Sequence, residues 1–291
     1  MNASIVVGLD GSTESTAAAH WAAREALLRD LPLNLVHAAD WSSPLGVPAT
    51  GTAAGREWAE ALLRDAVDEL RNMHAGLEVR AQSIDGRPAA SLAIAAASAT
   101  MLVLGSRGLG TLTGFVLGSV GMAVIRATEQ PVILIRAHEE VLPHAASRHT
   151  DRDMVVGVDI GGPCDEVLDF AFEEASRRGC TLRAVLTWTL PPLVGYGAAY
   201  DPSLHEQIAD SMTVGLDDRL QPWRDTFPSV DVVARAPVGH AAEQLLAAGA
   251  EAGLVVVGRR IRQSSVGAHI GPVAHAVLHH SRAPVAVIAH R

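Results

Sequence analysis

Short apolar runs recur along the first half of the chain at intervals that fit a β-sheet. Ser4–Leu9 is an apolar run that leads into Asp10, a pattern typical of a strand buried on both faces. The segment Glu78–Ile84 alternates between apolar and polar residues, which predicts a strand that is less buried. Three more apolar runs predict further strands, at Leu33–Ala38, Met101–Leu104 and Val132–Ile135.

Helical periodicity fills the segments between these runs. Ser12 or Thr13 can cap the first helix, because a short side-chain oxygen accepts a hydrogen bond from a free N–H of the first turn. We expect this helix to extend to about Arg29, and the remaining helices to separate the later strands. In the first helix, the apolar residues on one side are Ala18, Trp21, Ala22 and Ala26. The second helix is indicated by apolar residues at helical spacing, namely Trp58, Leu62, Ala66, Leu70 and Met73. Two further helices are expected at Ala89–Ala99 and Gly118–Ala127.

The second half of the chain repeats the first. Ile5–Ser12 recurs as Met154–Gly161, and Leu102–Gly108 recurs as Val255–Ile261. The spacing between the copies is slightly larger in the later region, which indicates a small insertion within the second copy. Two copies of this length indicate tandem domains rather than a solenoid.

Five strands separated by helices predict a parallel, doubly wound α/β sheet with helices on both faces. We therefore expect two tandem Rossmann-like domains at residues 1–137 and 153–291, joined by a polar linker at 138–152. Sheets of this kind bind ligands beyond the carboxyl ends of their strands, where the winding reverses.

The composition is that of a globular protein and excludes several chemistries. Hydrophobic residues make up 48% and charged residues 19% of the chain, and the net charge of -9 argues against a nucleic-acid partner. All 23 basic residues are arginine, which excludes a Schiff base, a catalytic lysine and a lysine-dependent phosphate loop. Cys164 and Cys180 fit neither a disulfide framework nor a zinc signature.

The amino-terminal residues show neither the charged nor the long apolar region of a signal peptide. No run approaches the roughly 18 apolar residues that a membrane span requires. We therefore expect a cytoplasmic protein that has no membrane partner.

The stretch from Gly105 to Ser119 carries the most informative motif. It follows a predicted buried strand, precedes a predicted helix and has the spacing Gly-x2-Gly-x9-Gly-Ser, with the inner glycines at Gly108 and Gly118. Bare glycine lets a backbone approach a phosphate, and the free N–H groups at a helix start attract an anion. Arg107 could approach a phosphate or stay solvated, and a glycine-rich loop that merely turns is the alternative interpretation.

With its repeat and this loop, the whole chain resembles a tandem universal stress protein, and each half resembles one domain of that family. The resemblance implies an adenine nucleotide alpha hydrolase-like fold. In the family, the same spacing with Ser or Thr at the last position marks the members that bind ATP. It also implies that the loop and the helix start hold the phosphates, that Asp10 lies near the ribose and adenine, and that the backbone around His37 and Ala38 meets the adenine.

The binding residues implied by the resemblance come from three segments of the first copy. They are Asp10, Gly11, Ser12, His37, Ala38, Gly105, Arg107, Gly108, Gly118, Ser119 and Val120. The expected cofactor is ATP, and a requirement for Mg²⁺ is left open.

The second copy departs from the motif at two of its four positions. Ile261 replaces a glycine and takes up space with a branched side chain, and Pro272 removes a hydroxyl and an N–H while still suiting a first helical turn. Losing two donors to a charged group costs about 3–6 kcal/mol. We therefore expect one nucleotide per chain, in the first copy, although Asp159 is retained. Three arginines of the second copy could hold an anion in another geometry: Arg259, Arg260 and Arg262.

Several histidines have spacings that resemble known sites. His275 and His279 are four residues apart on a predicted helix, which can suit zinc, but no third ligand lies beside them, so we expect a surface or interface pair. His269–Pro272 resembles the start of a synthetase motif whose companion loop needs a lysine. His144 and His149 lie in the predicted linker, so we expect no metal site.

Three classes of function follow from these observations. The first is a nucleotide-responsive stress or regulatory protein, in which ordering of the glycine loop changes a surface read by an unknown protein partner. The second is an enzyme of the same fold, a slow ATP hydrolase or an adenylating enzyme. Efficient catalysis is disfavoured because the loop lacks paired carboxylates and an obvious base, whereas slow hydrolysis of ATP is left open. The third is a structural assembly protein without nucleotide. The resemblance implies an intramolecular pseudo-dimer of the two domains and leaves a homodimer of chains open.

Overall fold

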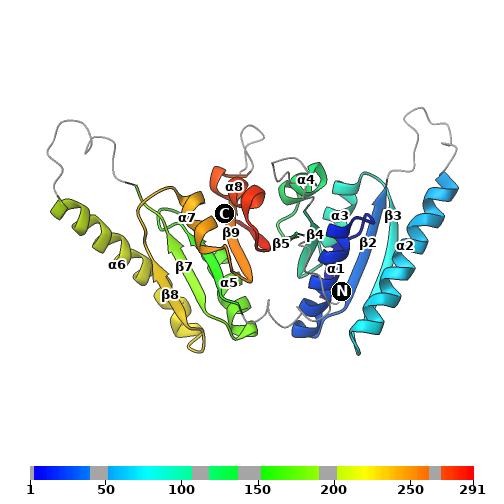
Figure 1. Cartoon of the computed structure of the whole chain (residues 1–291), viewed down its shortest axis with the longest axis horizontal. Helices are drawn as coiled ribbons and strands as arrows, with labels where there is room; N and C mark the ends of the chain where they lie inside the picture. Colours follow the sequence, from blue (N-terminus) through cyan, green and yellow to red (C-terminus); the bar gives the residue numbers. More distant parts are fainter. Residues whose placement is uncertain (1–2, 40–51, 107–117, 137–151, 190–201, 262–269) are drawn as a thin grey trace. The chain divides into compact units, whose positions relative to one another are not determined.

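The computed structural model describes residues 3–39, 52–106, 118–136, 152–189, 202–261 and 270–291. The chain forms two compact units, Met1–Leu142 and Pro143–Arg291. Each unit consists of parallel strands with helices packed on them (Figure 1).

In the first unit, strands and helices alternate strictly. The strands lie in the order β3-β2-β1-β4-β5, and every adjacent pair is parallel. The elements are β1 (Ile5–Gly8), α1 (Thr13–Arg29), β2 (Leu33–Ala39), α2 (Thr52–Met73), β3 (Val79–Asp85), α3 (Pro88–Ala96), β4 (Met101–Gly105), α4 (Ser119–Ala127) and β5 (Val132–Ile135).

This strand order places the reversal of winding between β1 and β4. The chain moves outward from β1 to β3, returns to β4 on the other side of β1 and continues to β5. Right-handed crossovers then put the first two helices on one face and the last two on the other, and the contacts between α1 and α2 and between α3 and α4 agree. The predicted doubly wound sheet is confirmed.

The strand signals of the sequence are confirmed because they reflect burial directly. β1, β4 and β5 are almost completely buried, and β3 is less buried, as predicted. The burial of β3 does not follow the alternation of its sequence, because Val79 is buried and Ala81 is exposed. The helical stripe in α2 is less accurate. Ala59 and Leu63 are buried, whereas Trp58 and Met73 are 50% and 49% exposed. Helix α2 carries apolar residues on several of its sides. Which of them are buried therefore depends on which side packs against the sheet.

The second unit repeats this arrangement. Its strands lie in the order β10-β9-β6-β7-β8, and all adjacent pairs are parallel. The elements are β6 (Met154–Val158), α5 (Asp165–Arg178), β7 (Leu182–Leu186), α6 (Pro202–Thr226), β8 (Val232–Arg235), α7 (Ala241–Ala248), β9 (Leu254–Arg260), α8 (Pro272–His280) and β10 (Val285–His290).

Each unit buries a glutamate at the matching position of its first helix. Glu25 in α1 and Glu174 in α5 are 2% and 1% exposed. Arg29 Nε lies 2.8 Å from Glu25 Oε1, and Arg178 Nη2 lies 3.1 Å from Glu174 Oε2. Burying a carboxylate costs free energy unless an opposite charge pairs with it. These arginines therefore contribute to the core between helix and sheet and do not act only at the surface.

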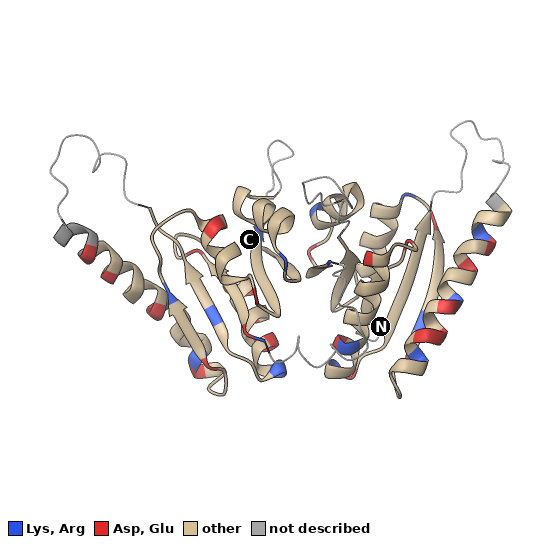
Figure 2. Ribbon diagram, viewed as in Figure 1, with Lys and Arg blue, Asp and Glu red and all other residues tan. Residues whose placement is uncertain are grey.

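Charged residues gather on the long helices α2 and α6 (Figure 2). Across the residues with described positions, no helix combines the length and the apolar character that a membrane crossing requires.

Candidate functional site

The chain leaves β1 through a preformed turn at Asp10–Ser12. Asp10 Oδ1 accepts hydrogen bonds from the backbone N–H of Ser12, at 3.0 Å, and from the Ser12 hydroxyl. Gly11 has φ +81°, a conformation that glycine adopts without a Cβ clash. Ser12 is also the cap of α1, because its Oγ accepts from the Ser15 backbone N–H at 3.2 Å. The predicted cap is therefore Ser12 and not Thr13.

Gly105, at the carboxyl end of β4, has a packing role that sequence reasoning missed. A Cβ on this residue would lie 2.5 Å from the Glu14 carbonyl carbon and 2.6 Å from the Ser15 backbone nitrogen. Its lack of a side chain lets the first turn of α1 approach the end of β4. The motif gave no sign of this role, because glycine is equally expected beside a phosphate.

Among the described residues, no side chain caps the first turn of helix α4. Gly118 is its N-cap, in extended backbone, and makes no side-chain cap hydrogen bond. Ser119 and Val120 follow in the first turn and are exposed. Free N–H groups and the helix dipole make such a start favourable for an anion. Arg107 and Gly108, the other predicted residues of this loop, lie outside the described residues.

The end of β2 is tied to the end of β1 by His37. This side chain is 5% exposed, and its Nδ1 donates to the Leu9 carbonyl oxygen at 2.8 Å. The imidazole therefore supports the edge of the sheet from inside. The neighbouring Ala38 is less buried, so the backbone there, rather than the imidazole, is the accessible part of the predicted adenine edge.

Trp58 on α2 joins this group of residues, although the sequence pattern identified it only as part of a helical stripe. Its ring centroid lies 5.5 Å from that of His37, with an interplanar angle of 78°. Its Cζ2 lies 2.9 Å from the place where a Cβ on Gly11 would stand. The described contacts thus connect the Asp10–Ser12 turn, His37, Trp58 and Gly105. Gly118–Val120 reaches the same edge of the sheet through the topology, because α4 follows β4.

The second unit preserves the first turn but fills the space beside it. Asp159 Oδ1 accepts the Gly161 backbone N–H at 2.9 Å, as Asp10 does from Ser12. The guanidinium of Arg260 lies directly against Gly162, where a Cβ would meet its Nη2. Helix α5 begins only at Asp165, after Pro163, whereas the position matching the start of α1 is Gly162.

Comparison with known proteins agrees with this duplicated architecture. Residues 1–136 and 152–289 match the model of the universal stress protein family. The chain belongs to the universal stress protein family. It is 35% identical to universal stress protein Rv2005c of Mycobacterium tuberculosis, over 97% of this chain and 96% of that protein. It is 32% identical to universal stress protein Rv2623 of the same organism, over 97% and 95%.

A crystal structure of a universal stress protein from Archaeoglobus fulgidus shows the same fold. It aligns with a TM-score of 0.72 at 17% identity and covers 98% of both chains. The tandem α/β organisation is therefore common to this chain and a solved member of the family.

In the second unit of this universal stress protein, an indole stands at the end of the second strand. Trp188 follows β7, at the position that matches Ala39 in the first unit, and is 8% exposed. Its Nε1 donates to the Ala236 carbonyl oxygen at 2.9 Å, and its backbone N–H donates to the Pro237 carbonyl oxygen at 3.4 Å. A large, anchored side chain therefore stands at the position where the first unit has Ala39.

Arg219 of α6 also reaches the start of α5. Its Nη2 donates to Asp165 Oδ1 at 2.9 Å, and its Nε lies 3.4 Å from Cys164 Sγ. The hydrogen bond with Cys164 raises the pKa of Arg219, and the charges of Asp165 and Asp159 act in the same direction. In the described part of this edge, Arg219 is therefore paired with a carboxylate, that of Asp165; Arg262 lies outside the described residues.

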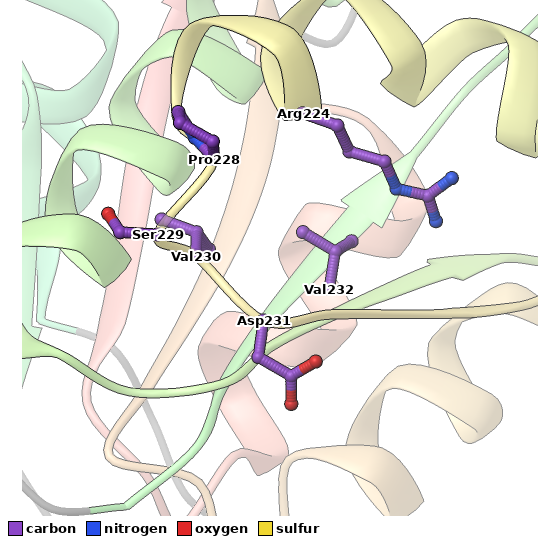
Figure 3. Close-up of a pocket in the computed structure, with 6 residues that line it drawn as sticks. All are labelled: Arg224, Pro228, Ser229, Val230, Asp231 and Val232. Atoms are coloured by element: carbon purple, nitrogen blue, oxygen red, sulfur yellow. The ribbon is translucent and has the colours of Figure 1, made fainter.

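Two other features of the universal stress protein lie outside this site. The rings of His275 and His279 have centroids 4.3 Å apart on α8, and within the described ranges no group of three or more His, Cys, Asp or Glu residues could hold a metal. An open hollow of about 410 Å³ lies at the amino end of β8, opposite the carboxyl edge (Figure 3). It is lined by Arg224, Pro228, Ser229, Val230, Asp231 and Val232.

Proposed function

We propose that the first unit binds one ATP and that the protein acts as a nucleotide-responsive regulator. The observation that carries the proposal is the start of α4 at Gly118, for which the described residues provide no side-chain cap. It lies at the switch point of the sheet and at the same edge as the Asp10–Ser12 turn. A helix start of this kind suits phosphate oxygens, because its N–H groups and dipole both favour negative charge.

The residues of the first unit suit the other parts of a nucleotide. The Asp10 carboxylate is exposed and held by the turn, so it can accept hydrogen bonds from ribose hydroxyls. The Ala38 backbone at the end of β2 offers N–H and C=O groups for the edge of a base. Gly105 leaves room for the start of α1, and Gly11 leaves room for the Trp58 ring of α2. These features support a binding mode in which ATP lies along the carboxyl edge of the sheet. Its phosphates would lie at the start of α4, its ribose at Asp10 and its adenine at Ala38.

The second unit supports a stoichiometry of one nucleotide per chain. Trp188 fills the edge after β7, Arg260 packs on Gly162, and Pro272 begins α8 in place of a serine. Losing two donors to charged oxygens corresponds to about 3–6 kcal/mol, or about two to four decades in affinity. If ATP binds one of two conformations of the protein more tightly, ATP binding shifts the population toward that conformation. A partner that recognises this conformation would then respond to the nucleotide.

The test is nucleotide content and stoichiometry. Protein purified without added nucleotide is denatured and analysed for adenine, and nucleotide-free protein is then titrated with ATP by calorimetry. We expect about one equivalent per chain, and loss of binding in Gly118→Arg. The matched control is Gly271→Arg, at the corresponding N-cap of α8, where a Cβ would meet no described atom within 4 Å. This variant should bind ATP as the wild type does.

Three results would contradict the proposal: no affinity for ATP, two equal sites, or unchanged binding by a folded Gly118→Arg variant. Turnover of ATP at about 1–10³ per second would instead favour an enzyme. Thermal stabilisation by ATP distinguishes a binding protein from a purely structural one, since a ligand that binds only the folded state raises its apparent stability.

A further inference from the structure

We propose that Trp58 is a specificity residue of the first unit, whose indole provides an aromatic surface for the base of a purine nucleotide. This inference rests on the proposed function and names one more contact of the same site. It concerns a side chain of α2, outside the glycine loop and outside the first-strand turn.

The indole is held on one side by rigid parts of the site. Its Cζ2 and Cη2 lie 2.9 and 3.2 Å from the place of a Cβ on Gly11, so the ring touches the turn after β1. It meets the His37 ring at 5.5 Å in an edge-type geometry, and His37 is itself fixed to the Leu9 carbonyl oxygen. Two strand ends therefore set the position of the ring.

The rest of the indole remains exposed. Trp58 is 50% exposed, whereas Trp21 and Trp188 are 4% and 8% exposed. A tryptophan buries large apolar area when the fold uses it only for packing. Here half of that area is left at the carboxyl edge of a parallel sheet, beside the backbone proposed to meet the base.

The second unit shows that the fold does not need an aromatic residue at this place. Helices α2 and α6 end at matching positions, so Trp58 corresponds to Ser211 and Leu62 to Gly215. There Ile160 replaces Gly11, and its Cδ1 lies 3.4 Å from the place of a Cβ on Gly215. In the second unit, aliphatic packing therefore covers the turn that Trp58 covers in the first unit. The exposed indole is found only in the first of these two matching positions, in the unit proposed to bind the nucleotide.

Base–aromatic contacts provide a measurable selectivity. Removing a stacking aromatic weakens nucleotide binding by about 5- to 150-fold per base in other systems. A purine offers a larger π surface than a pyrimidine, and inorganic tripolyphosphate offers none. We therefore expect the contribution of Trp58 to decrease from ATP and GTP to CTP and UTP, and to be absent for tripolyphosphate.

The experiment measures the affinities of the full chain for ATP, CTP and inorganic tripolyphosphate in wild type, Trp58→Ala and Trp58→Phe. We expect Trp58→Ala to weaken ATP about 5- to 150-fold, to weaken CTP less and to leave tripolyphosphate unchanged. Trp58→Phe should retain most of the ATP affinity. In the wild type, ATP should quench part of the tryptophan emission, and this quenching should be missing in Trp58→Phe. Trp223→Phe, on α6 of the second unit, is the control that should change neither affinity nor quenching.

The outcomes separate the two proposals. If wild-type protein does not bind ATP, the proposed function is wrong and this inference falls with it. If the wild type binds and Trp58→Ala binds ATP equally well, or loses ATP and tripolyphosphate affinity alike, only the role of Trp58 is overturned. Should Trp58→Ala fail to fold, quenching decides: quenching that persists in folded Trp58→Phe overturns the role.

Discussion

Gly105, the last residue of β4, lies against the first turn of α1, where a Cβ would stand 2.6 Å from the backbone nitrogen of Ser15. The obstacle is backbone within a capped helix, which cannot rotate away as a side chain can. Glycine is therefore required here for the folded state itself, whether or not a ligand is present.

We expect Gly105→Ala to lower the free energy of unfolding by about 1–3 kcal/mol, the usual cost of overpacking. The measurement is urea denaturation in the absence of nucleotide. Gly258→Ala, at the matching position of β9, is the control, because a Cβ there meets the end of the His290 side chain at 2.9 Å, which can shift. A Gly105→Ala variant as stable as Gly258→Ala would contradict the packing role.

Gly215 is a helix-interior glycine whose replacement should stabilise the protein. An alanine Cβ would make ordinary contact with Ile160 Cδ1 at 3.4 Å, and the helix would gain about 0.5–1 kcal/mol in backbone entropy. We expect a higher melting temperature for Gly215→Ala. In contrast, Gly179→Ala should lower it, because Gly179 ends α5 with φ +64°. If both variants changed the melting temperature by the same amount in the same direction, the local backbone conformation would not determine the effect of the substitution.

Glu174 is the carboxylate that neutralises a buried arginine in the second unit. Its side chain is 1% exposed and that of Arg178 is 3% exposed. Glu174→Ala should therefore lower the free energy of unfolding by about 3–5 kcal/mol, because it removes one partner of a buried pair. Glu78→Ala removes an exposed partner of Arg80 and should cost under about 1 kcal/mol. Chemical denaturation of both variants gives the comparison, and similar small losses would rule out the buried-pair argument.

His74, after α2, should make stability depend on pH. Burial lowers its pKa from the ordinary value of 6.5, and the charges of His20 and Arg24 act in the same direction. The folded state thus disfavours the proton that the unfolded chain binds below about pH 6.5. The contribution is fully present above that pH and is lost as the pH falls through the lowered pKa.

The measurement for His74 compares urea midpoints of wild type and His74→Gln at pH 8 and pH 5. We expect the wild type to lose more stability between these values than the variant, because only the wild type must protonate this imidazole on unfolding. If both proteins lose the same amount, His74 does not contribute to the acid sensitivity.

The repeat, the strands and the order of elements follow from the residues of the chain alone. Buried parallel strands such as β1, β4 and β5 need continuous apolar runs, and a right-handed βαβ crossover leaves little choice of topology. The departure of the second copy from the motif was also visible, because Ile261 and Pro272 are changes of residue type at fixed positions of that motif.

Which residues contact one another depends on the packing of the folded units. Trp58 is distant in sequence from Gly11 and His37, and nothing in the periodicity of α2 directs its ring to them. The same holds for Arg260 on Gly162 and for the α1 backbone on Gly105. Hydrophobic patterning is a property of one element, whereas these contacts depend on how closely two elements approach, and that distance is set by packing of the whole unit.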